Sequence, residues 1–254
     1  MKKHVMTGAV FALGAGGTAL ASELSVADIL EVEVWANGEL QWSSNNSSGG
    51  FSDLVVNEDG TYTVIGGWEA ETWSSDWTFD LGMRDPEGAA GQSRGLNSGF
   101  VISNFNFTNN TGDDNAEFEL IANAFVGPLT SPTVMTGSFS GSLNSGDPGV
   151  EMAELSVPTG DFLYTAMADA SVARTLIDDT YSQSTMLSDS LGPFGFTSES
   201  GPSVINELSI RHSFGLTDGD NVNLLGAFVV TEIPAPGASL LLGLAGAAGA
   251  RRRR

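Results

Sequence analysis

Apolar and polar residues alternate along several short runs of this chain. The pattern is clearest in four of them: SDWTFDL (75–81), FVISNFNF (100–107), TVMTGSFSGSL (133–143) and INELSIRHSF (205–214). In the first run Trp77, Phe79 and Leu81 fall on one face of a strand, with Asp and Thr residues opposite. A period of two gives a strand one buried face and one solvated face. The pattern therefore predicts half-buried β-strands.

Turn-forming residues separate these runs. Segments that combine Gly or Pro with Asn or Asp are NEDG (57–60), DPEG (85–88), NNTGDDN (109–115), SGDPG (145–149) and TDGDN (217–221). Roughly ten to twelve strands at this spacing predict an all-β fold, a two-sheet β-sandwich of jelly-roll type.

One domain over 22–232 accounts for the body of the chain, with a boundary near residue 90 as the alternative. The stretch 168–174 has a composition that a helix would tolerate, but we predict a hairpin there, with Asp169-Ala170 at its turn. Two stretches rich in Ser, Asn and Gly are predicted as flexible loops, 43–50 and 182–203.

The N-terminal segment has the pattern of a leader. Two lysines and a histidine (2–4) precede an apolar stretch that ends in Ala19 and Ala21, a small-x-small cleavage pattern. We predict a signal peptide over 1–21 and a mature chain that begins at Ser22. A transmembrane anchor is the alternative, although the stretch is short for a span of about 20 residues and contains four glycines.

Once both ends are set aside, the body is strongly acidic. All 31 acidic residues lie between Glu23 and Glu232, where only four arginines oppose them, which gives a formal charge of −27. Such a surface repels nucleic acid and anionic lipid, and it suits divalent cations, a salty medium or simple solubility. Cysteine is absent, which excludes thiol catalysis and cysteine metal sites.

The C-terminal segment 233–254 has three parts. Pro234, Ala235 and Pro236 form an extended hook, because proline fixes φ and disfavours helix just before it. Fourteen uncharged residues follow, which span about 21 Å as a helix and fall short of a hydrocarbon core of about 30 Å. The chain then closes, by the positive-inside rule, with a cytoplasmic stop made of Arg251, Arg252, Arg253 and Arg254. We therefore expect a short apolar helix with transient membrane attachment.

This order of hook, apolar stretch and arginine cluster resembles the PEP-CTERM sorting signal, the tag of exosortase substrates in Gram-negative bacteria. The resemblance implies export, recognition at the proline motif, cleavage by a membrane-embedded transpeptidase-like enzyme, and delivery to the cell surface or extracellular matrix. The usual glutamate between the prolines is Ala235 here, and the nearest acid is Glu232. Segments 97–112 and 212–230 also resemble parts of exported proteins that carry this tag, without implying an activity. An ordinary membrane anchor is the alternative.

Two acidic loops carry the candidate metal ligands. Asp113 and Asp114 lie in the first loop, and Asp218 and Asp220 lie in the second. Calcium takes six to eight oxygens from loops of this kind. Neither loop has EF-hand spacing, and acidic clusters are expected in a chain this acidic. We therefore predict no obligatory cofactor and keep calcium as the candidate ion.

Catalytic patterns are weak. His212, the one histidine left after leader removal, shares its side of the 205–214 run with apolar residues and is predicted to be a core residue. The segment GSFSG (137–141) has phenylalanine where a nucleophile elbow needs serine. Paired carboxylates hydrolyse glycosides, but a chain with this many acids offers such pairs in any fold. We expect no enzyme and keep a secreted hydrolase as the second alternative.

The five tryptophans all lie in the first third of the chain. Trp77 belongs to an alternating run and is predicted to be in the core, whereas Trp42 and Trp73 flank polar loops and are the candidates for exposed rings that would stack on sugars. The favoured interpretation packs all five in the core or its rim. We predict an exported structural or interaction protein, with an exosortase and an exopolysaccharide as partners, and a carbohydrate-binding module as the first alternative.

Overall fold

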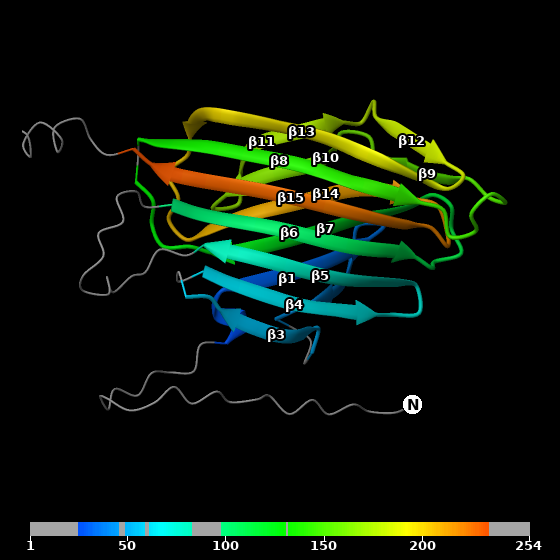
Figure 1. Cartoon of the computed structure of the whole chain (residues 1–254), viewed down its shortest axis with the longest axis horizontal. Helices are drawn as coiled ribbons and strands as arrows, with labels where there is room; N and C mark the ends of the chain where they lie inside the picture. Colours follow the sequence, from blue (N-terminus) through cyan, green and yellow to red (C-terminus); the bar gives the residue numbers. More distant parts are fainter. Residues whose placement is uncertain (1–24, 46–48, 59–60, 83–97, 131, 234–254) are drawn as a thin grey trace, which may run out of the picture.

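The computed structural model describes residues 25–45, 49–58, 61–82, 98–130 and 132–233 (Figure 1). The predicted leader (1–21), with Ala19 and Ala21, the predicted mature N-terminus Ser22, and all of the predicted tag (233–254) except Ile233 lie outside these ranges. The described residues form antiparallel strands and one short 3-10 helix, η1 (Val26–Asp28). In this part of the chain no helix is long and apolar enough to cross a membrane.

The strands form two sheets that face each other, as the sequence predicted (Figure 1). Sheet A has the order β11-β10-β14-β7-β1-β2, with β9 paired to β14 and β12 paired to β9. Its strands are β1 (Leu30–Ala36), β2 (Glu39–Ser43), β7 (Ala116–Phe125), β9 (Ala153–Ser156), β10 (Phe162–Ala168), β11 (Ser171–Asp178), β12 (Ser182–Thr185) and β14 (Glu207–Leu216).

Sheet B has the order β13-β8-β15-β6-β5-β4-β3. Its strands are β3 (Phe51–Val56), β4 (Thr61–Glu69), β5 (Trp73–Gly82), β6 (Ser98–Asn109), β8 (Thr133–Asn144), β13 (Ser188–Gly201) and β15 (Asn221–Glu232). The strands on either side of residue 90, β5 and β6, are hydrogen-bonded neighbours in this sheet.

The core lies between the two sheets and consists of the inward side chains of the alternating runs. Phe107 of β6 is central to it: its ring centroid lies 4.6 Å from that of Phe118 on β7 and 5.6 Å from that of Phe214 on β14. Hydrogen bonds also join the sheets; in one of them the buried hydroxyl of Tyr164 on β10 donates to the carbonyl of Ala227 on β15 at 2.7 Å. Rings and this bond together fix the two sheets against each other.

The predicted hairpin at Asp169-Ala170 is confirmed. Strands β10 and β11 pair antiparallel, with Ala168 opposite Ser171. Both turn residues have positive φ, 48° for Asp169 and 60° for Ala170. Two such residues match the twist of the flanking strands, as in a type I′ turn.

The prediction of a flexible loop over 182–203 is wrong, because this stretch contains β12 and β13. β13 pairs with β8 along its length but shifts register twice, between Leu191 and Phe194 and between Phe196 and Glu199. Each irregularity interrupts the alternation of buried and exposed residues. A strand at a sheet edge also tolerates the Gly, Ser and Pro that made this sequence resemble a loop.

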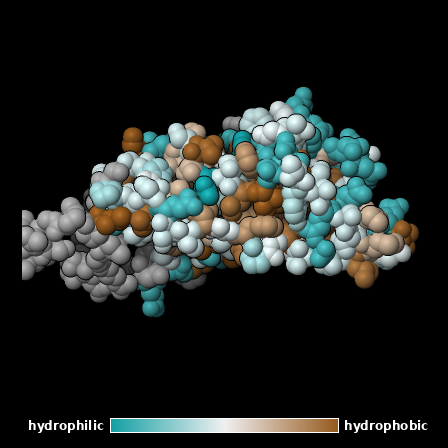
Figure 2. All heavy atoms as spheres, turned by 90° about the horizontal axis from the view of Figure 1, so that it is seen from above, coloured by the Kyte–Doolittle hydropathy of each residue, from teal (hydrophilic) through white to brown (hydrophobic). Residues whose placement is uncertain are grey.

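The edges β11 and β13 lie on the same side of the sandwich. Half-buried apolar side chains of both strands, including Leu176, Ile177 and Phe194, pack against the core there. Figure 2 looks onto this side and shows hydrophobic atoms between hydrophilic ones. Arg174 of β11 links the two edge strands: its guanidinium lies over the ring of Phe196 and pairs with Glu199, both on β13.

Candidate functional site

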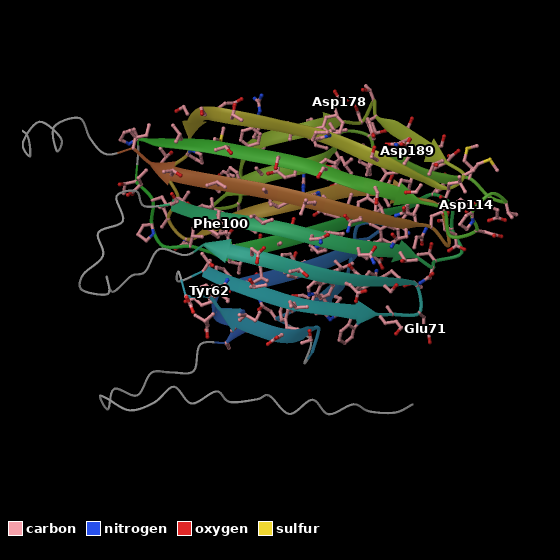
Figure 3. All side chains as sticks on the ribbon, in the orientation of Figure 1. Tyr62, Glu71, Phe100, Asp114, Asp178 and Asp189 are labelled. Atoms are coloured by element: carbon pink, nitrogen blue, oxygen red, sulfur yellow. The ribbon has the colours of Figure 1, made fainter. Side chains whose placement is uncertain are left out.

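The outer face of sheet B faces the reader in Figures 1 and 3. It carries short polar side chains in cross-strand rows, one of which is interrupted by the exposed Leu225. Strand register aligns residues of β8, β15, β6 and β5 across the sheet. We call this surface the amide face; its members are Ser74, Asp76, Thr78, Asn104, Asn106, Thr108, Ser140, Ser142, Asn144, Asn221 and Asn223. Toward the end of the sheet where Phe100 is labelled in Figure 3, outward positions such as Ile102 and Val229 are apolar instead.

Hydrogen bonds between neighbouring strands fix the amides. Nδ2 of Asn221 donates to Oδ1 of Asn106 at 2.8 Å, and Nδ2 of Asn223 donates to Oδ1 of Asn104 at 2.8 Å. Nδ2 of Asn144 donates to Oδ1 of Asn221 at 3.2 Å. These bonds hold the asparagine side chains in fixed orientations across three strands.

A depression of about 710 Å³ lies on this face and extends over β15, β6, β5 and β4. Asn104, Asn106 and Asn223 line one part of it, and Asp76 and Glu69 line another. Gly67 faces outward beside Asp76, and a Cβ placed there would lie 2.6 Å from Oδ1 of Asp76. The carboxylate of Asp76 therefore lies over Gly67, in the space that a side chain would fill.

The depression is acidic and hydroxyl-rich. Its lining includes two carboxylates and no basic residue. Within the described residues the basic side chains are Arg174, paired with Glu199 at 3.4 Å, and Arg211, paired with Glu119 at 3.6 Å and Asp161 at 3.4 Å. Both arginines in the described part of the chain are therefore already paired with carboxylates, and neither is left to bind an anionic ligand.

Trp42 and Trp73, the candidates for exposed stacking rings, are buried, as the favoured interpretation had it. Trp42 is 4% exposed and Trp73 is 1% exposed, so neither can stack on a ligand. Trp42 lies 5.1 Å from Trp77, centroid to centroid, and Trp73 stacks on Phe107 at 5.9 Å. Both occupy inward positions of their strands, so the strand pattern outweighs the polar loops beside them. The burial of Trp77 agrees with its predicted place in the core.

Two tryptophans are only half-buried. Trp35 donates its indole N–H to Oε2 of Glu33 at 2.9 Å on the outer face of sheet A. Trp68 of β4 lies against Trp42 at 5.6 Å and lines the rim of the depression. They lie on different sheets, so they do not form one aromatic patch.

The structure brings the two acidic loops side by side, at the end of the sandwich where Asp114 is labelled in Figure 3. The amide of Gly112 donates to Asp218 at 2.7 Å, and the amide of Asp218 donates to Asp114 at 3.4 Å. Asp113 accepts from the amide of Asn115 at 2.9 Å, within its own loop. These carboxylates satisfy backbone donors of the turns.

Asp220 differs from the other three aspartates in its burial and its partners. It is 4% exposed and accepts hydrogen bonds from Thr217 and from the amide of Gly146, the latter at 2.9 Å. Among the residues that the structure describes, no three His, Asp or Glu side chains are grouped to hold a metal ion. Calcium at these loops therefore stays a prediction, without a ligand set in this part of the chain.

His212 points into the core, as its side of the strand indicated. Its Nδ1 lies 3.1 Å from the carbonyl of Leu163, and Nε2 lies 3.4 Å from the hydroxyl of Ser103. Rings of Phe105, Phe139 and Tyr164 surround the imidazole. Burial lowers the pKa of His212 to about 4, because the charged form would lose its hydration.

Among the described residues, two carboxyl groups have raised pKa values. Burial raises the pKa of Glu119, although the positive charge of Arg211 opposes the shift. Burial and the negative charges of Asp169 and Glu31 raise the pKa of Glu207. Neither glutamate lines the depression on the amide face or a second one of about 290 Å³ beside Asp114. A perturbed acid and a cleft, which a hydrolase would combine, do not coincide in these places.

Sequence reasoning missed the asparagines of the amide face. The signal was present in FNF and NVN, where asparagines alternate with apolar residues and must share the outward face. Their convergence depends on the pairing of β15 with β6, which are separated by more than one hundred residues.

No known family model matches the chain, and no curated protein matches it in sequence.

Proposed function

We propose that this chain is an exported interaction protein of the bacterial surface or extracellular matrix, delivered by its leader and sorted through its C-terminal tag. The partners in this proposal are an exosortase-type enzyme, which cuts at the proline hook, and an extracellular polysaccharide. The proposal includes a jelly-roll connection of the sandwich, and a short apolar helix over 237–250 that would hold the chain in the membrane until it is cut.

The observation that carries the proposal is where the described sandwich ends. β15 lies within sheet B and pairs on both sides, up to Thr231 with β6 and up to Glu232 with β8. The amide of Ile233 then donates to the carbonyl of Pro132 at 2.8 Å. Ile233, the first residue of the predicted tag, is thus hydrogen-bonded to the sandwich, and the proline hook begins at the next residue.

The contacts of Glu232 also place it in the sandwich rather than in the tag. Its carboxylate accepts hydrogen bonds from the amide of Thr130 at 2.5 Å and from the hydroxyl of Thr130 at 3.0 Å. The acid nearest to the proline hook is thus engaged by the sandwich. An enzyme that cuts this tag must recognise the prolines and the residues after them, with Ala235 in place of the usual glutamate.

The test is the intact mass of the protein recovered from cells with and without the exosortase. We expect loss of residues 1–21 in both strains, and loss of the segment after the proline hook only where the enzyme is present. A mass that retains Arg251 to Arg254 in both strains would mean that the segment is an anchor. A variant with both Pro234 and Pro236 replaced by alanine should keep its tail in either strain.

A further inference from the structure

We propose that the depression on the amide face binds an uncharged polysaccharide, through pairs of neighbouring hydroxyl groups. This inference deepens the proposed function and rests on it for the choice of an extracellular polymer. The site itself is argued from the side chains of β15, β6, β5 and β4.

The first argument is the set of hydrogen-bonding groups that the face leaves open. The bonds between strands use Nδ2 of Asn223 and Oδ1 of Asn104. Nδ2 of Asn104, Nδ2 of Asn106 and Oδ1 of Asn223 are left without a hydrogen bond among the described residues. The first two are donors and the third is an acceptor. Both kinds of group therefore line the depression within two adjacent strands.

The second argument is the carboxylate of Asp76. It is exposed, lies opposite Asn106 in the register of β5 and β6, and lies over Gly67, where a side chain would displace it. A sugar hydroxyl both donates and accepts. One hydroxyl of a neighbouring pair can donate to Asp76 while the other accepts from the amide of Asn106, which an apolar ligand cannot do.

The third argument is preorganisation. Long flexible side chains lose conformational entropy when a ligand immobilises them, at roughly 0.5–1.5 kcal/mol each. The asparagines of this face are short and already held by bonds of 2.8 Å across strands. Binding therefore orders little that folding has not ordered already.

Charge and extent select the ligand class. The lining has carboxylates and no basic residue, so a polymer that carries carboxylate or sulfate groups would be repelled. The depression crosses four strands, about 14 Å at a strand spacing of about 4.8 Å. A chain of sugars fits this length better than a single sugar does.

The experiment is affinity electrophoresis of the folded protein in native gels containing dextran, galactomannan or soluble xylan, with carboxymethyl-dextran as the charged counterpart. We expect retardation by at least one uncharged polymer and none by carboxymethyl-dextran. A variant with Asn104, Asn106 and Asn223 replaced by alanine should bind at least about tenfold more weakly than the wild type, because it loses three polar contacts. Asp76→Asn, which keeps the shape of the side chain, should also weaken binding severalfold.

The matched control is Asn123→Ala, the same substitution on the outer face of sheet A, which should bind like the wild type. Each variant is compared at equal folded fraction, measured by circular dichroism.

No retardation by any uncharged polymer, or full binding by the triple variant, would overturn the inference. So would equal binding of carboxymethyl-dextran, or a calorimetric signal with Ca²⁺ alone that the triple variant abolishes, which would make this a cation site. If the tag is cut as proposed but no polymer binds, the proposed export and sorting survive, and this inference fails together with the polysaccharide partner.

Discussion

The two faces of sheet B are built from the same strands and have opposite properties. In β6, Phe105 and Phe107 point inward and are fully buried, while Asn104 and Asn106 point outward and are exposed. The inward residues gain stability by losing water, at about 25 cal/mol per Å² of apolar surface. The outward residues stay in water and gain little. This separation lets the fold carry a binding surface whose side chains can change without loss of the sandwich.

The largest effect should come from the inner face. Phe107→Ala removes a ring that contacts Phe118, Phe214 and Trp73, and it leaves a cavity between the sheets. We expect the free energy of unfolding to fall by about 3–5 kcal/mol, measured by urea titration. The neighbouring outward change Asn106→Ala serves as the control and should cost about 0.5 kcal/mol or less. Equal losses in the two variants would contradict the division between the faces.

The second effect is a pH dependence that the core imposes. The pKa of His212 is about 4 in the folded protein, below its ordinary value near 6.5, so the unfolded chain binds the proton more tightly. Stability from this residue is present above pH 6.5 and is lost as the pH falls toward 4, by on the order of 3 kcal/mol. Tyr164 is the titratable group among its ring partners, and burial raises its pKa, so it stays neutral in this window.

The measurement is urea unfolding between pH 7 and pH 4 for the wild type and for His212→Gln. The variant should lose stability at pH 7, because the amide fills the site less well, and should also show a flatter slope with pH. Titrating carboxylates contribute to both proteins and cancel in the comparison. An unchanged slope in the variant would mean that His212 does not stay neutral in the folded state.

The alternation of apolar and polar residues made the inner face predictable. It identified the runs that became β5, β6, β8 and β14, and it placed Phe105, Phe107 and His212 inside. Where the alternation breaks, prediction failed: the bulges of β13 made an edge strand look like a loop.

The environments formed by distant segments were not predictable. Trp42 is buried because Phe51, Trp68 and Trp77 converge on it from three strands of the opposite sheet. The amide face requires the register of β15 against β6, which pairs Asn223 with Asn106. A single sequence shows which side a residue takes, but not which distant strand lies beside it.

A smaller effect should follow from the hydrogen bond that Tyr164 donates to Ala227 between the sheets. Tyr164→Phe keeps the ring and removes the hydroxyl that donates to Ala227 at 2.7 Å. We expect a loss of about 1–2 kcal/mol in the free energy of unfolding, since the carbonyl in the core loses a partner that water cannot replace. Ser138→Ala, on the outer face of β8, tests the loss of an exposed hydroxyl and should be close to neutral.

The smallest effect should come from a hydrogen bond of nearly the same length on the outer face. Nδ2 of Asn223 lies 2.8 Å from Oδ1 of Asn104, yet both side chains reach water and each can exchange its partner for solvent. A double-mutant cycle with Asn104→Ala and Asn223→Ala should give a coupling energy of about 0.5 kcal/mol or less. A coupling as large as the loss from Tyr164→Phe would mean that the amide face contributes to the stability of the sandwich. Its asparagines would then be explained by folding alone, and their open donors would no longer argue for a ligand.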